Sequence, residues 1–327
     1  MNNLFSKLAQ KRVEILLGKN RFTVIASHIN PDGDAIGSSM ALALGLKKIG
    51  VNVAVVLEPY HPRFNIIPGK ELLYTGSLCD LCPDIFVALD CGDAERLGDA
   101  QEVLKRAKHV MVIDHHLNNT ITADVRYINE SASSTSQLVY EILDGLAPLD
   151  KDIASALYAG IICDTGGFRH GCTNPGTLEV CAELMSHGIP FTQIYNELMH
   201  VRTINEVNIF KKALEKLTFH AEGTLALAFV SFDDLLNTKA TPQDLDGIAE
   251  FILNISGVLV AAFAYEKEPG QTKISLRSKS IDVCRVAQGF SGGGHRNAAG
   301  ARYEGRPAEA LAAVSAAIVK NGMNMNE

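Results

Sequence analysis

Several features that readily classify a protein are missing from this sequence of 327 residues. Its apolar runs, of which residues 258–265 are among the longest, are too short to cross a bilayer. Residues 1–20 predict an amphipathic helix and do not have the pattern of a signal peptide. The 7 cysteines lack the spacing of a disulfide framework, which is typical of a reducing compartment. We therefore expect a cytoplasmic protein without a membrane partner.

The sequence also has no block of basic residues. Its formal net charge is −7, whereas proteins that follow a long nucleic-acid backbone usually carry a basic stripe. Neither a P-loop nor a G-x-G-x-x-G fingerprint occurs. The one C-x-x-C, Cys79 to Cys82, has no second pair with which to bind zinc, so we interpret both as loop cysteines. Either the partner is not a polyanion, or it is a short one held by a metal ion and a few basic groups.

The stretch from residue 22 to residue 40 predicts a buried strand, a tight loop and a helix. Its loop carries His28, Asp32 and Asp34. Ligands collect at the carboxyl ends of strands in open α/β sheets, so these side chains could hold a divalent cation. The alternative is that they only cap the helix, with Asp34 as the N-cap. This stretch alone leaves both interpretations open.

Three further polar turns follow apolar segments of the same half of the chain. Asp90 follows the strand expected over 84–89, and the run Asp114 to His116 follows the strand expected over 109–113. Asp164 follows the helix expected over 151–163. Strands that alternate with helices at this spacing predict a doubly wound parallel sheet, in which the strand ends share one edge. We therefore expect these turns to meet.

The side chains of these turns form a set of hard metal ligands without thiolates. Carboxylates and imidazoles suit Mn²⁺ or Mg²⁺, with Zn²⁺ or Fe²⁺ as further candidates. There are too many for one catalytic ion with an open position, and they suit two ions that share a carboxylate. The set is His28, Asp32, Asp34, Asp90, His115 and Asp164. It predicts metal-dependent hydrolysis of a phosphoester.

The chain is expected to divide into a metal-binding domain (1–187), a helical linker (188–216) and a smaller α/β domain (217–327). The smaller domain contains the run Gly292-Gly293-Gly294-His295, with Arg277 upstream. Glycines let the backbone approach a ligand closely and direct N–H groups at an anion. The alternative is a flexible glycine-rich loop with an incidental histidine.

These motifs together resemble a known family, the DHH phosphoesterases. The resemblance rests on Ser27 to Gly37, Asp90, Asp114 to His116 and Asp164, and the run Gly292 to His295 is similar to the signature of the DHHA1 domain. It covers nearly the whole chain in the right order. It implies an α/β fold, with a DHH domain joined by the linker to a DHHA1 domain and an active site in the cleft between them.

The resemblance also implies roles for individual residues. One Mn²⁺ would be held by His28, Asp32 and Asp90. A second would be held by Asp34, Asp90, His115 and Asp164, so that Asp90 bridges the two ions. Asp114 would orient the neighbouring metal site, and His116 would contact the scissile phosphate or protonate the leaving oxygen. The far phosphate and nucleotide would be bound by Arg277, Gly292, Gly293, Gly294 and His295, with Arg169 as a further phosphate contact.

The compact layout resembles the branch of bifunctional oligoribonucleases and 3′-phosphoadenosine-5′-phosphate phosphatases. The implied substrates are short single-stranded RNA, dinucleotides and a nucleoside bisphosphate. The alternative with the same chemistry is a phosphodiesterase for linear or cyclic dinucleotides. A non-catalytic nucleotide-binding protein would be expected to lack one or more ligands, and none is missing here. A homodimer is compatible with the sequence.

Overall fold

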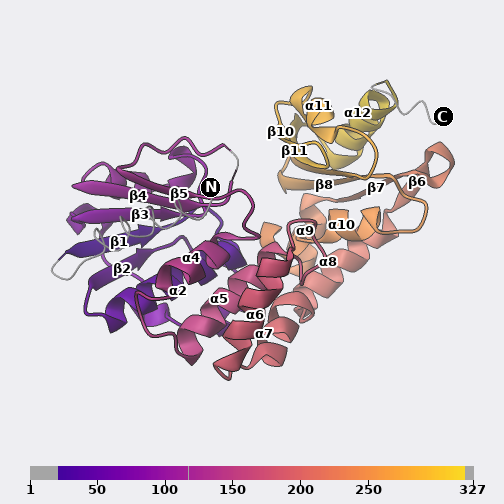
Figure 1. Cartoon of the computed structure of the whole chain (residues 1–327). Helices are drawn as coiled ribbons and strands as arrows, with labels where there is room; N and C mark the ends of the chain where they lie inside the picture. The colour runs from indigo at the N-terminus through magenta and orange to yellow at the C-terminus, as the bar shows by residue number, and fades with distance from the viewer. Residues whose placement is uncertain (1–20, 117, 321–327) are drawn as a thin grey trace. The chain divides into compact units, whose positions relative to one another are not determined.

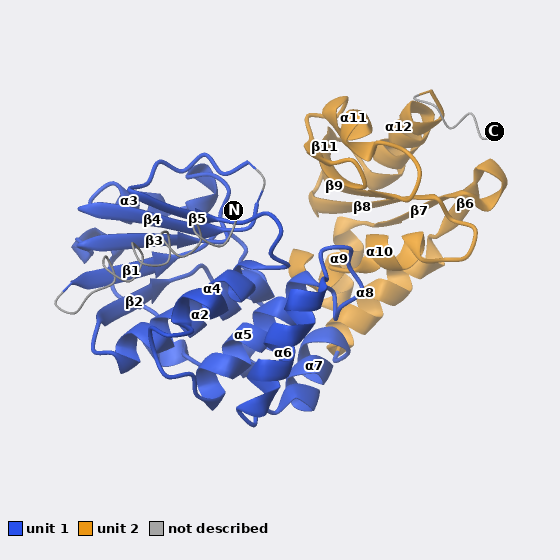
Figure 2. Ribbon diagram, viewed as in Figure 1, with its two compact units in different colours: residues 1–201 blue, residues 202–327 orange. Residues whose placement is uncertain are grey.

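The computed structural model describes residues 21–116 and 118–320. The amphipathic helix expected over residues 1–20 lies outside this part of the chain. The chain divides into two compact units, residues 1–201 and 202–327, drawn in blue and orange in Figure 2. The division falls within the expected linker of residues 188–216. The linker and the three domain limits stay predictions.

Unit 1 is built on a five-stranded sheet. Its strands are β1 (Phe22–Ala26), β2 (Asn52–Val56), β3 (Ile85–Leu89), β4 (His109–Asp114) and β5 (Val125–Ile128). Their order is β2-β1-β3-β4-β5, and every neighbouring pair runs parallel. All residues of β3 are buried, as expected for a central parallel strand with a continuous apolar sequence. The predicted parallel sheet is confirmed.

Helices cover both faces of this sheet. They are α2 (Gly33–Lys48), α3 (Ala100–Leu104), α4 (Thr135–Leu143), α5 (Lys151–Asp164), α6 (Pro175–Ser186) and α7 (Phe191–Met199). Successive strand residues point to opposite faces. Ile25 and Val87 pack in the core beneath α2, α4 and α5, which lie together in Figure 1. Val24 and Phe86 pack in a separate core with residues of α3. The doubly wound arrangement is therefore confirmed.

Small residues bring α2 and α5 unusually close together. A Cβ added at Gly37 would lie 2.5 Å from the carbonyl oxygen of Ala156, and one at Gly33 would lie 2.1 Å from Sγ of Cys163. Gly160 of α5 has the same property, since its added Cβ would lie 2.8 Å from Oδ1 of Asp34. The absence of side chains here lets the start of α2 approach the end of α5. The polar residues at those two helix ends are thereby placed near one another.

Four short 3₁₀ helices complete the connections of unit 1. They are η1 (Pro62–Ile66), η2 (Lys70–Leu72), η3 (Leu78–Asp80) and η4 (Glu95–Leu97). Residues 97–107 do not form one continuous helix, because Gly98 has a positive φ of 55° that a helix cannot continue through. Only the five residues of α3 remain α-helical there.

Unit 2 is built on a six-stranded mixed sheet. Its strands are β6 (Thr218–His220), β7 (Leu225–Val230), β8 (Val260–Glu268), β9 (Gln271–Ser278), β10 (Gly293–His295) and β11 (Ala298–Glu304). The order is β10-β11-β9-β8-β7-β6, and β7 and β8 run parallel while the other pairs are antiparallel. Its helices are α8 (Ile204–Glu215), α9 (Phe232–Thr238), α10 (Ile248–Leu253), α11 (Val283–Gln288) and α12 (Pro307–Lys320), with η5 (Ala221–Gly223) and η6 (Pro242–Leu245).

The two faces of the second sheet are covered differently. One face packs against α11 and α12, in a core to which β7, β8, β9 and β11 all contribute. The other face packs against α8, α9 and α10, in a core whose strand residues come from β7 and β8. The part of this second face made by β9, β10 and β11 lines a pocket instead.

Several elements of unit 2 are not those expected from the sequence. The strands β6, β10 and β11 and the helix α9 were not expected. The sequence of residues 242–255 favours a single helix, but the structure divides it into η6 and α10, because Gly247 between them has a φ of 84°. Within residues 21–116 and 118–320, no helix has both the length and the apolar character required to span a membrane.

Candidate active site

The predicted metal ligands follow the carboxyl ends of adjacent parallel strands. His28 follows β1, Asp90 follows β3 and His115 follows β4, and these strands are neighbours in the sheet. Two more ligands lie at the start of α2, and the last one ends α5. The edge formed by these strand ends is where open α/β sheets bind ligands. The six side chains that meet there are His28, Asp32, Asp34, Asp90, His115 and Asp164.

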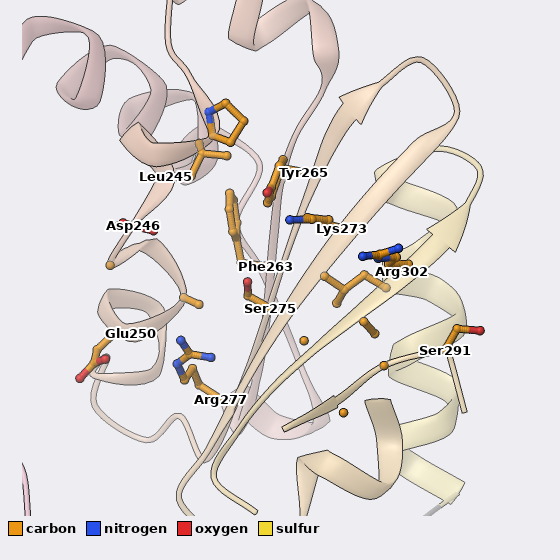
Figure 3. Close-up of a pocket in the computed structure, with 18 residues that line it drawn as sticks. Leu245, Asp246, Glu250, Phe263, Tyr265, Lys273, Ser275, Arg277, Ser291 and Arg302 are labelled. Carbon is orange, nitrogen blue, oxygen red and sulfur yellow. The ribbon is translucent and has the colours of Figure 1, made fainter. Parts of the chain in front are cut away.

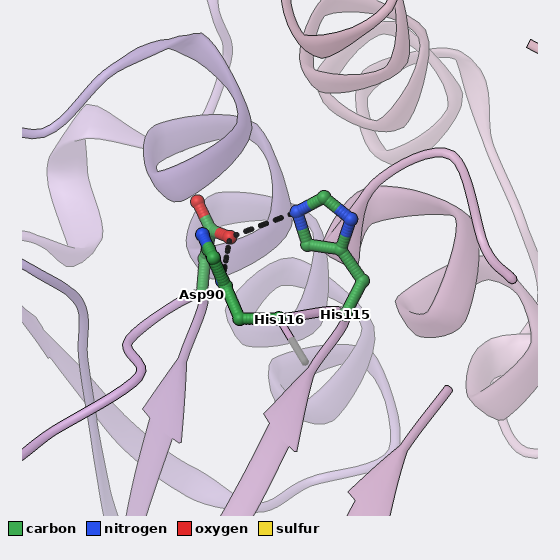
Figure 4. Close-up of side chains that lie close together, drawn as sticks. All are labelled: Asp90, His115 and His116. Carbon is green, nitrogen blue, oxygen red and sulfur yellow. Dashed lines mark ion pairs between the residues drawn. The ribbon is translucent and has the colours of Figure 1, made fainter. Parts of the chain in front are cut away.

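These side chains form two groups, in each of which the possible ligand atoms lie within 4.8 Å of one another. The groups are His28, Asp32 and Asp90, and Asp34, His115 and Asp164. Asp90 faces both groups, because its Oδ2 lies 3.7 Å from Nε2 of His28 and its Oδ1 lies 3.5 Å from Nε2 of His115. Figure 4 shows Asp90 Oδ1 paired with His115 and His116. One carboxylate with an oxygen towards each group has the arrangement of a bridging ligand.

Asp32 combines the two interpretations that the sequence left open. Its Oδ1 accepts hydrogen bonds of 3.0 Å from the backbone N–H groups of Asp34 and Ala35, so Asp32 is the N-cap of α2. The suggestion that Asp34 is the cap is therefore wrong. The second oxygen of Asp32 lies 3.8 Å from Nε2 of His28, and the side chain is 58% exposed. One oxygen thus caps the helix while the other is directed at the candidate metal position.

His28 is held in the form that can bind a metal. Its Nδ1 lies 2.8 Å from the carbonyl oxygen of Ile29, and because a carbonyl only accepts, Nδ1 must carry the proton. The lone pair of the neutral ring is then on Nε2, the atom that faces Asp32 and Asp90. The hydroxyl of Ser27 donates to the carbonyl of Leu89, which ties the ends of β1 and β3 together.

Asp34 is anchored by the first turn of α4. Its two oxygens accept backbone hydrogen bonds from Thr135 at 2.6 Å and from Ser136 at 2.9 Å. The N-terminus of a helix favours negative charge, and Ser134 caps the same helix. The side chain is fully buried, and burial followed by the charges of Asp90 and Asp164 raises the pKa of Asp34 well above its usual value. Nearby carboxylates therefore repel one another, and a bound cation would relieve that repulsion.

Asp90 is held in an unusual backbone conformation. Its φ of 51° is in the left-handed region, which Asp tolerates better than most residues but which still stores strain. The hydroxyl of Thr135 donates to its Oδ1 at 3.1 Å. Burial acts to raise the pKa of Asp90, but the contacts with His115 and His28 outweigh it and hold the pKa below its usual range. Asp90 therefore stays ionised between the two groups.

Three carboxylates act on His115 at the second group. Burial acts to lower the pKa of His115, but the contact with Asp90 and the charges of Asp34 and Asp164 raise it to about 10. Burial raises the pKa of Asp164 to about 6. The protonated imidazole thus supplies the positive charge that a metal ion would supply after displacing that proton.

His116 belongs to a separate chain of hydrogen bonds. Its Nδ1 donates to Oδ1 of Asp114 at 2.7 Å, and Oδ2 of Asp114 accepts a bond of 2.7 Å from the side-chain amide of Asn119. Asn119 also donates to the carbonyl of Cys91 at 2.8 Å. Asp114 is fully buried, whereas the side chain of His116 is 37% exposed. The contact with Asp114 raises the pKa of His116, and the fixed Nδ1 leaves Nε2 available to another group.

Sequence reasoning missed Asn119 and Thr135. Asn119 is the last residue of the run Asp-His-His-Leu-Asn-Asn, so its proximity to the motif was a usable signal. Thr135 belongs to a Ser/Thr cluster, residues 131–135, whose sequence suggests only a cap for the following helix. Its contact with Asp90 joins residues 45 positions apart and depends on the packing of α4 over the strand ends.

The predicted substrate residues lie in different parts of the molecule. Arg277, Gly292 and Gly293 line a pocket of about 590 Å³ on the second sheet (Figure 3). Gly294 and His295 continue β10 next to this pocket and are exposed. Arg169 belongs to unit 1, where it follows α5 and its Nε donates to the carbonyl of Gly166.

The three consecutive glycines have different structural reasons to be glycine. A Cβ on Gly292 would lie 2.1 Å from the carbonyl oxygen of Gly300, and one on Gly294 would lie 2.6 Å from that of Ala298. Gly294 also has a φ of 141°. The close pairing of β10 with β11 therefore explains why positions 292 and 294 are glycine. A Cβ on Gly293 would meet no atom within 4 Å, so packing does not explain Gly293.

Residues 289–293 also match the pattern G-x-S-x-G, which sequence reasoning overlooked. In serine hydrolases this pattern forms a sharp turn from a strand into a helix. Here Ser291 lies between helix α11 and strand β10, which is the opposite order. The match therefore does not indicate a nucleophilic serine.

Comparison with known proteins places both units in described domain families. Residues 23–161 match the N-terminal domain of the DHH family, and residues 223–320 match the DHHA1 domain. The chain belongs to the DHH family. A relative of this DHH protein in Thermus thermophilus, the bifunctional oligoribonuclease and PAP phosphatase NrnA, is 33% identical over 86% of this chain and 84% of the relative. The protein of that name from Bacillus subtilis is 28% identical over 85% and 88%.

Solved structures agree with this assignment. An exopolyphosphatase-related protein from Bacteroides fragilis superposes with a TM-score of 0.88 at 25% identity, covering 96% of each chain. The exonuclease RecJ, in a structure bound to manganese, gives a TM-score of 0.53 at 15% identity over 96% of this chain and 93% of RecJ. The likeness to RecJ shows a shared fold. The expected resemblance to DHH phosphoesterases is confirmed, and the protein is a hydrolase of that family.

Proposed function

We propose that this DHH-family protein hydrolyses short oligoribonucleotides to mononucleotides in a metal-dependent reaction, with 3′-phosphoadenosine 5′-phosphate as a second substrate. The observation that supports it most is the position of Asp90, with one oxygen towards His28 and the other towards His115. The substrate class is supported by the two relatives named as oligoribonuclease and PAP phosphatase. The acidic net charge of −7 fits a short substrate.

The donor set fits two divalent cations. His28, Asp32 and Asp90 would hold one ion, and Asp34, Asp90, His115 and Asp164 would hold the other. Oxygen and imidazole ligands suit Mn²⁺, and a RecJ structure of the same fold is bound to manganese. When bound, such a pair of ions lowers the pKa of a water molecule towards neutrality and offsets the charge that develops on the phosphate.

The chain itself would supply the proton for the leaving oxygen. Asp114 accepts the Nδ1 proton of His116, so Nε2 is the nitrogen that would transfer a proton to the oxygen when its bond to phosphorus breaks. The raised pKa of His116 favours the protonated ring that this role requires. Asn119 keeps Asp114 oriented by donating to its second oxygen.

Unit 2 would bind the part of the substrate that does not react. Arg277 supplies a cationic group to its pocket, and Gly293 presents backbone without a side chain there. The adjacent Gly292, Gly294 and His295 belong to the same proposed subsite. Arg169 of unit 1 would add a phosphate contact near the end of α5.

The direct test is to incubate the purified protein with a labelled diribonucleotide and Mn²⁺. We expect release of mononucleotides, loss of activity in EDTA and recovery when Mn²⁺ is restored. Parallel reactions with 3′-phosphoadenosine 5′-phosphate, pApA and a cyclic dinucleotide separate this proposal from the dinucleotide phosphodiesterase alternative. If the metal is shown to be bound and no mononucleotide is released from any oligoribonucleotide, the proposal is wrong.

A further inference from the structure

Cationic side chains form a row across the middle of the second sheet. The register of the strands places Arg302 of β11 directly beside Lys273 of β9, and Lys273 beside Tyr265 of β8. Because alternate residues of a strand share a face, Lys273, Ser275 and Arg277 point the same way. All of these residues line the pocket of Figure 3, where Lys273 and Arg302 lie together on the side opposite Asp246 and Glu250.

The two cations of this row have no charge partner of their own. Throughout residues 21–116 and 118–320, no carboxylate forms an ion pair with Lys273 or Arg302. Like charges directly opposite each other on neighbouring strands are destabilising. Burial, and then the charges of Lys267 and Arg302, lower the pKa of Lys273. An anion bound between Lys273 and Arg302 would turn this repulsion into attraction.

Between Arg277 and this row, the surface of the sheet carries two small residues. The intervening row consists of Gly300, Ser275 and Phe263, so two of its three members leave space above the sheet. Phe263 and Tyr265 stack along the β8 side, with ring centroids 6.4 Å apart. Phe263 is buried, so Tyr265 is the partly exposed ring beside the cationic row, an arrangement typical of surfaces that bind single-stranded nucleic acid.

We propose that Lys273 and Arg302 form a second phosphate subsite, which binds the backbone of a single-stranded oligonucleotide beyond the nucleotide held at Arg277. This inference rests on the proposed function, because that function places the substrate at Arg277. Lys273 lies four residues from Arg277 along β9, a distance of about 13 Å. Neighbouring phosphates of RNA are joined through a single sugar, and this link is too short to reach from Arg277 to Lys273. The subsite therefore engages substrates of four or more nucleotides and stays unused by dinucleotides and nucleoside bisphosphates.

The test compares two double variants that remove the same charge from opposite faces of one sheet. Lys273→Gln/Arg302→Gln removes the subsite, and Arg285→Gln/Lys320→Gln removes two exposed cations from α11 and α12 on the other face. Binding of a fluorescent pentaribonucleotide is measured in EDTA over a series of salt concentrations, with an unlabelled diribonucleotide measured by competition. For the first variant we expect about tenfold weaker binding of the pentanucleotide and unchanged binding of the dinucleotide. The slope of log affinity against log salt concentration should become shallower by about 0.7 for each phosphate that is no longer neutralised.

Turnover by the same proteins with Mn²⁺ provides the second measurement. We expect kcat/KM to fall for the pentanucleotide and to stay unchanged for the dinucleotide. Equal losses for both lengths, or an equal loss in the α11/α12 control, would overturn the subsite. It would also be overturned if inorganic polyphosphate of matched charge competes as well as the pentanucleotide, because the row would then recognise any phosphate chain. If the wild type hydrolyses no oligonucleotide but binds the pentanucleotide through Lys273 and Arg302, the subsite stands and the proposed function fails.

Discussion

The strand-end centre of unit 1 and the open sheet face of unit 2 are both polar, but their polar groups are held in opposite ways. In unit 1 the charged groups are fixed by protein partners: α4 anchors Asp34, Ile29 orients His28 and Asn119 holds Asp114. In unit 2 the facing pair Lys273 and Arg302 has no counterion among the described residues. The first arrangement fits the proposed metal ions, and the second fits the proposed anionic ligand.

The difference also explains how each region tolerates its own charge. The carboxylates of unit 1 repel one another, and they raise the pKa of His115 to about 10, so that its protonated ring offsets part of their charge. Lys273 and Arg302 of unit 2 are exposed, so water screens their repulsion. Unit 1 therefore depends on geometry fixed within the protein, whereas unit 2 depends on side chains that can adjust to a ligand. Substitutions in unit 1 should therefore have larger effects than substitutions on the open sheet face of unit 2.

Replacing the shared carboxylate should have the largest effect. Asp90→Asn keeps the shape and the tolerance for a positive φ but removes the charge between the two ligand groups. We expect kcat to fall by roughly 10⁴-fold or more, because both groups lose a ligand at once. Turnover of a diribonucleotide and Mn²⁺ stoichiometry by calorimetry are the measurements. Asp80→Asn, at an exposed carboxylate in η3, is the matched control. Full metal binding and activity in Asp90→Asn would contradict the shared-ligand arrangement.

Much of the strand-end centre was predictable from the sequence, for a physical reason. A fully buried parallel strand needs a continuous apolar run, so the abrupt change to Asp90 after β3 or to Asp114 at the end of β4 is easy to recognise. Parallel topology then brings such turns to one edge whatever the details of packing. Proximity could be predicted in this way, although the ligand roles stay proposals.

The supporting contacts could not be predicted in the same way. The bond from Thr135 to Asp90 and the bonds from α4 to Asp34 join positions 45 and about 100 residues apart, and they depend on how closely α4 packs. The link from Asn119 to Asp114 is local, but an asparagine in a loop has many other possible partners. Sequence patterns identify charged groups more readily than the neutral groups that orient them.

Replacing Asn119 should have the next largest effect, because Asn119 orients Asp114, the partner of the proposed general acid His116. We expect Asn119→Ala to lower kcat about 10- to 100-fold with little change in KM or in Mn²⁺ affinity, because Asp114 loses one of its two anchors. Asn118→Ala, at the adjacent exposed residue, is the control. In a His116→Ala background, Asn119→Ala should lower kcat little further, because Asn119 acts through His116 in this proposal. A full additional loss there would show that Asn119 has only a structural role.

The open face of unit 2 was the least predictable part of the fold. The run from 291 to 300 contains four glycines, and neither an anion-binding glycine run nor a flexible loop predicts the β10 strand and the hairpin with β11 that it forms. Glycine is uncommon within strands because it weakens them. Here Gly292 and Gly294 are required because β10 approaches β11 so closely. The pairing of Lys273 with Arg302 depends on the register between β9 and β11, which composition does not reveal.

Substitutions of two adjacent glycines of β10 should have smaller effects, one on substrate binding and the other on stability. Gly293→Ala adds a methyl group where no atom lies within 4 Å, so we expect an unchanged Tm and a several-fold higher KM with kcat retained. Gly294→Ala introduces a side chain at a φ of 141° and 2.6 Å from a carbonyl oxygen, so we expect it to lower stability by about 1–3 kcal/mol. Thermal unfolding and oligonucleotide kinetics separate the two. An unchanged KM in Gly293→Ala would remove Gly293 from the proposed substrate site.

The smallest expected effect concerns an ion pair of unit 1 that lies far from the strand-end centre. Asp150 caps the start of α5, and its Oδ2 lies 2.5 Å from Nζ of Lys48, about 20 Å of helix away from Asp164. Burial acts to raise the pKa of Asp150, but bonds from backbone N–H groups and from Lys48 outweigh it and lower the pKa. A lowered carboxyl pKa stabilises the folded state above the unfolded value of about 4, and this stabilisation disappears as the pH falls through the folded value.

Asp150→Asn keeps a capping oxygen and removes the charge, so it isolates the part of the stability that depends on pH. We expect the wild type to exceed this variant by about 0.5 kcal/mol at pH 7, because an exposed ion pair contributes little, and by nothing near pH 2. Asp150→Ala, which also removes the cap, should be about 1 kcal/mol less stable than Asp150→Asn at both pH values. Urea unfolding at the two pH values measures all three proteins. A constant difference between wild type and Asp150→Asn would mean that Asp150 stabilises unit 1 through hydrogen bonds alone and that its charge pairing with Lys48 contributes nothing.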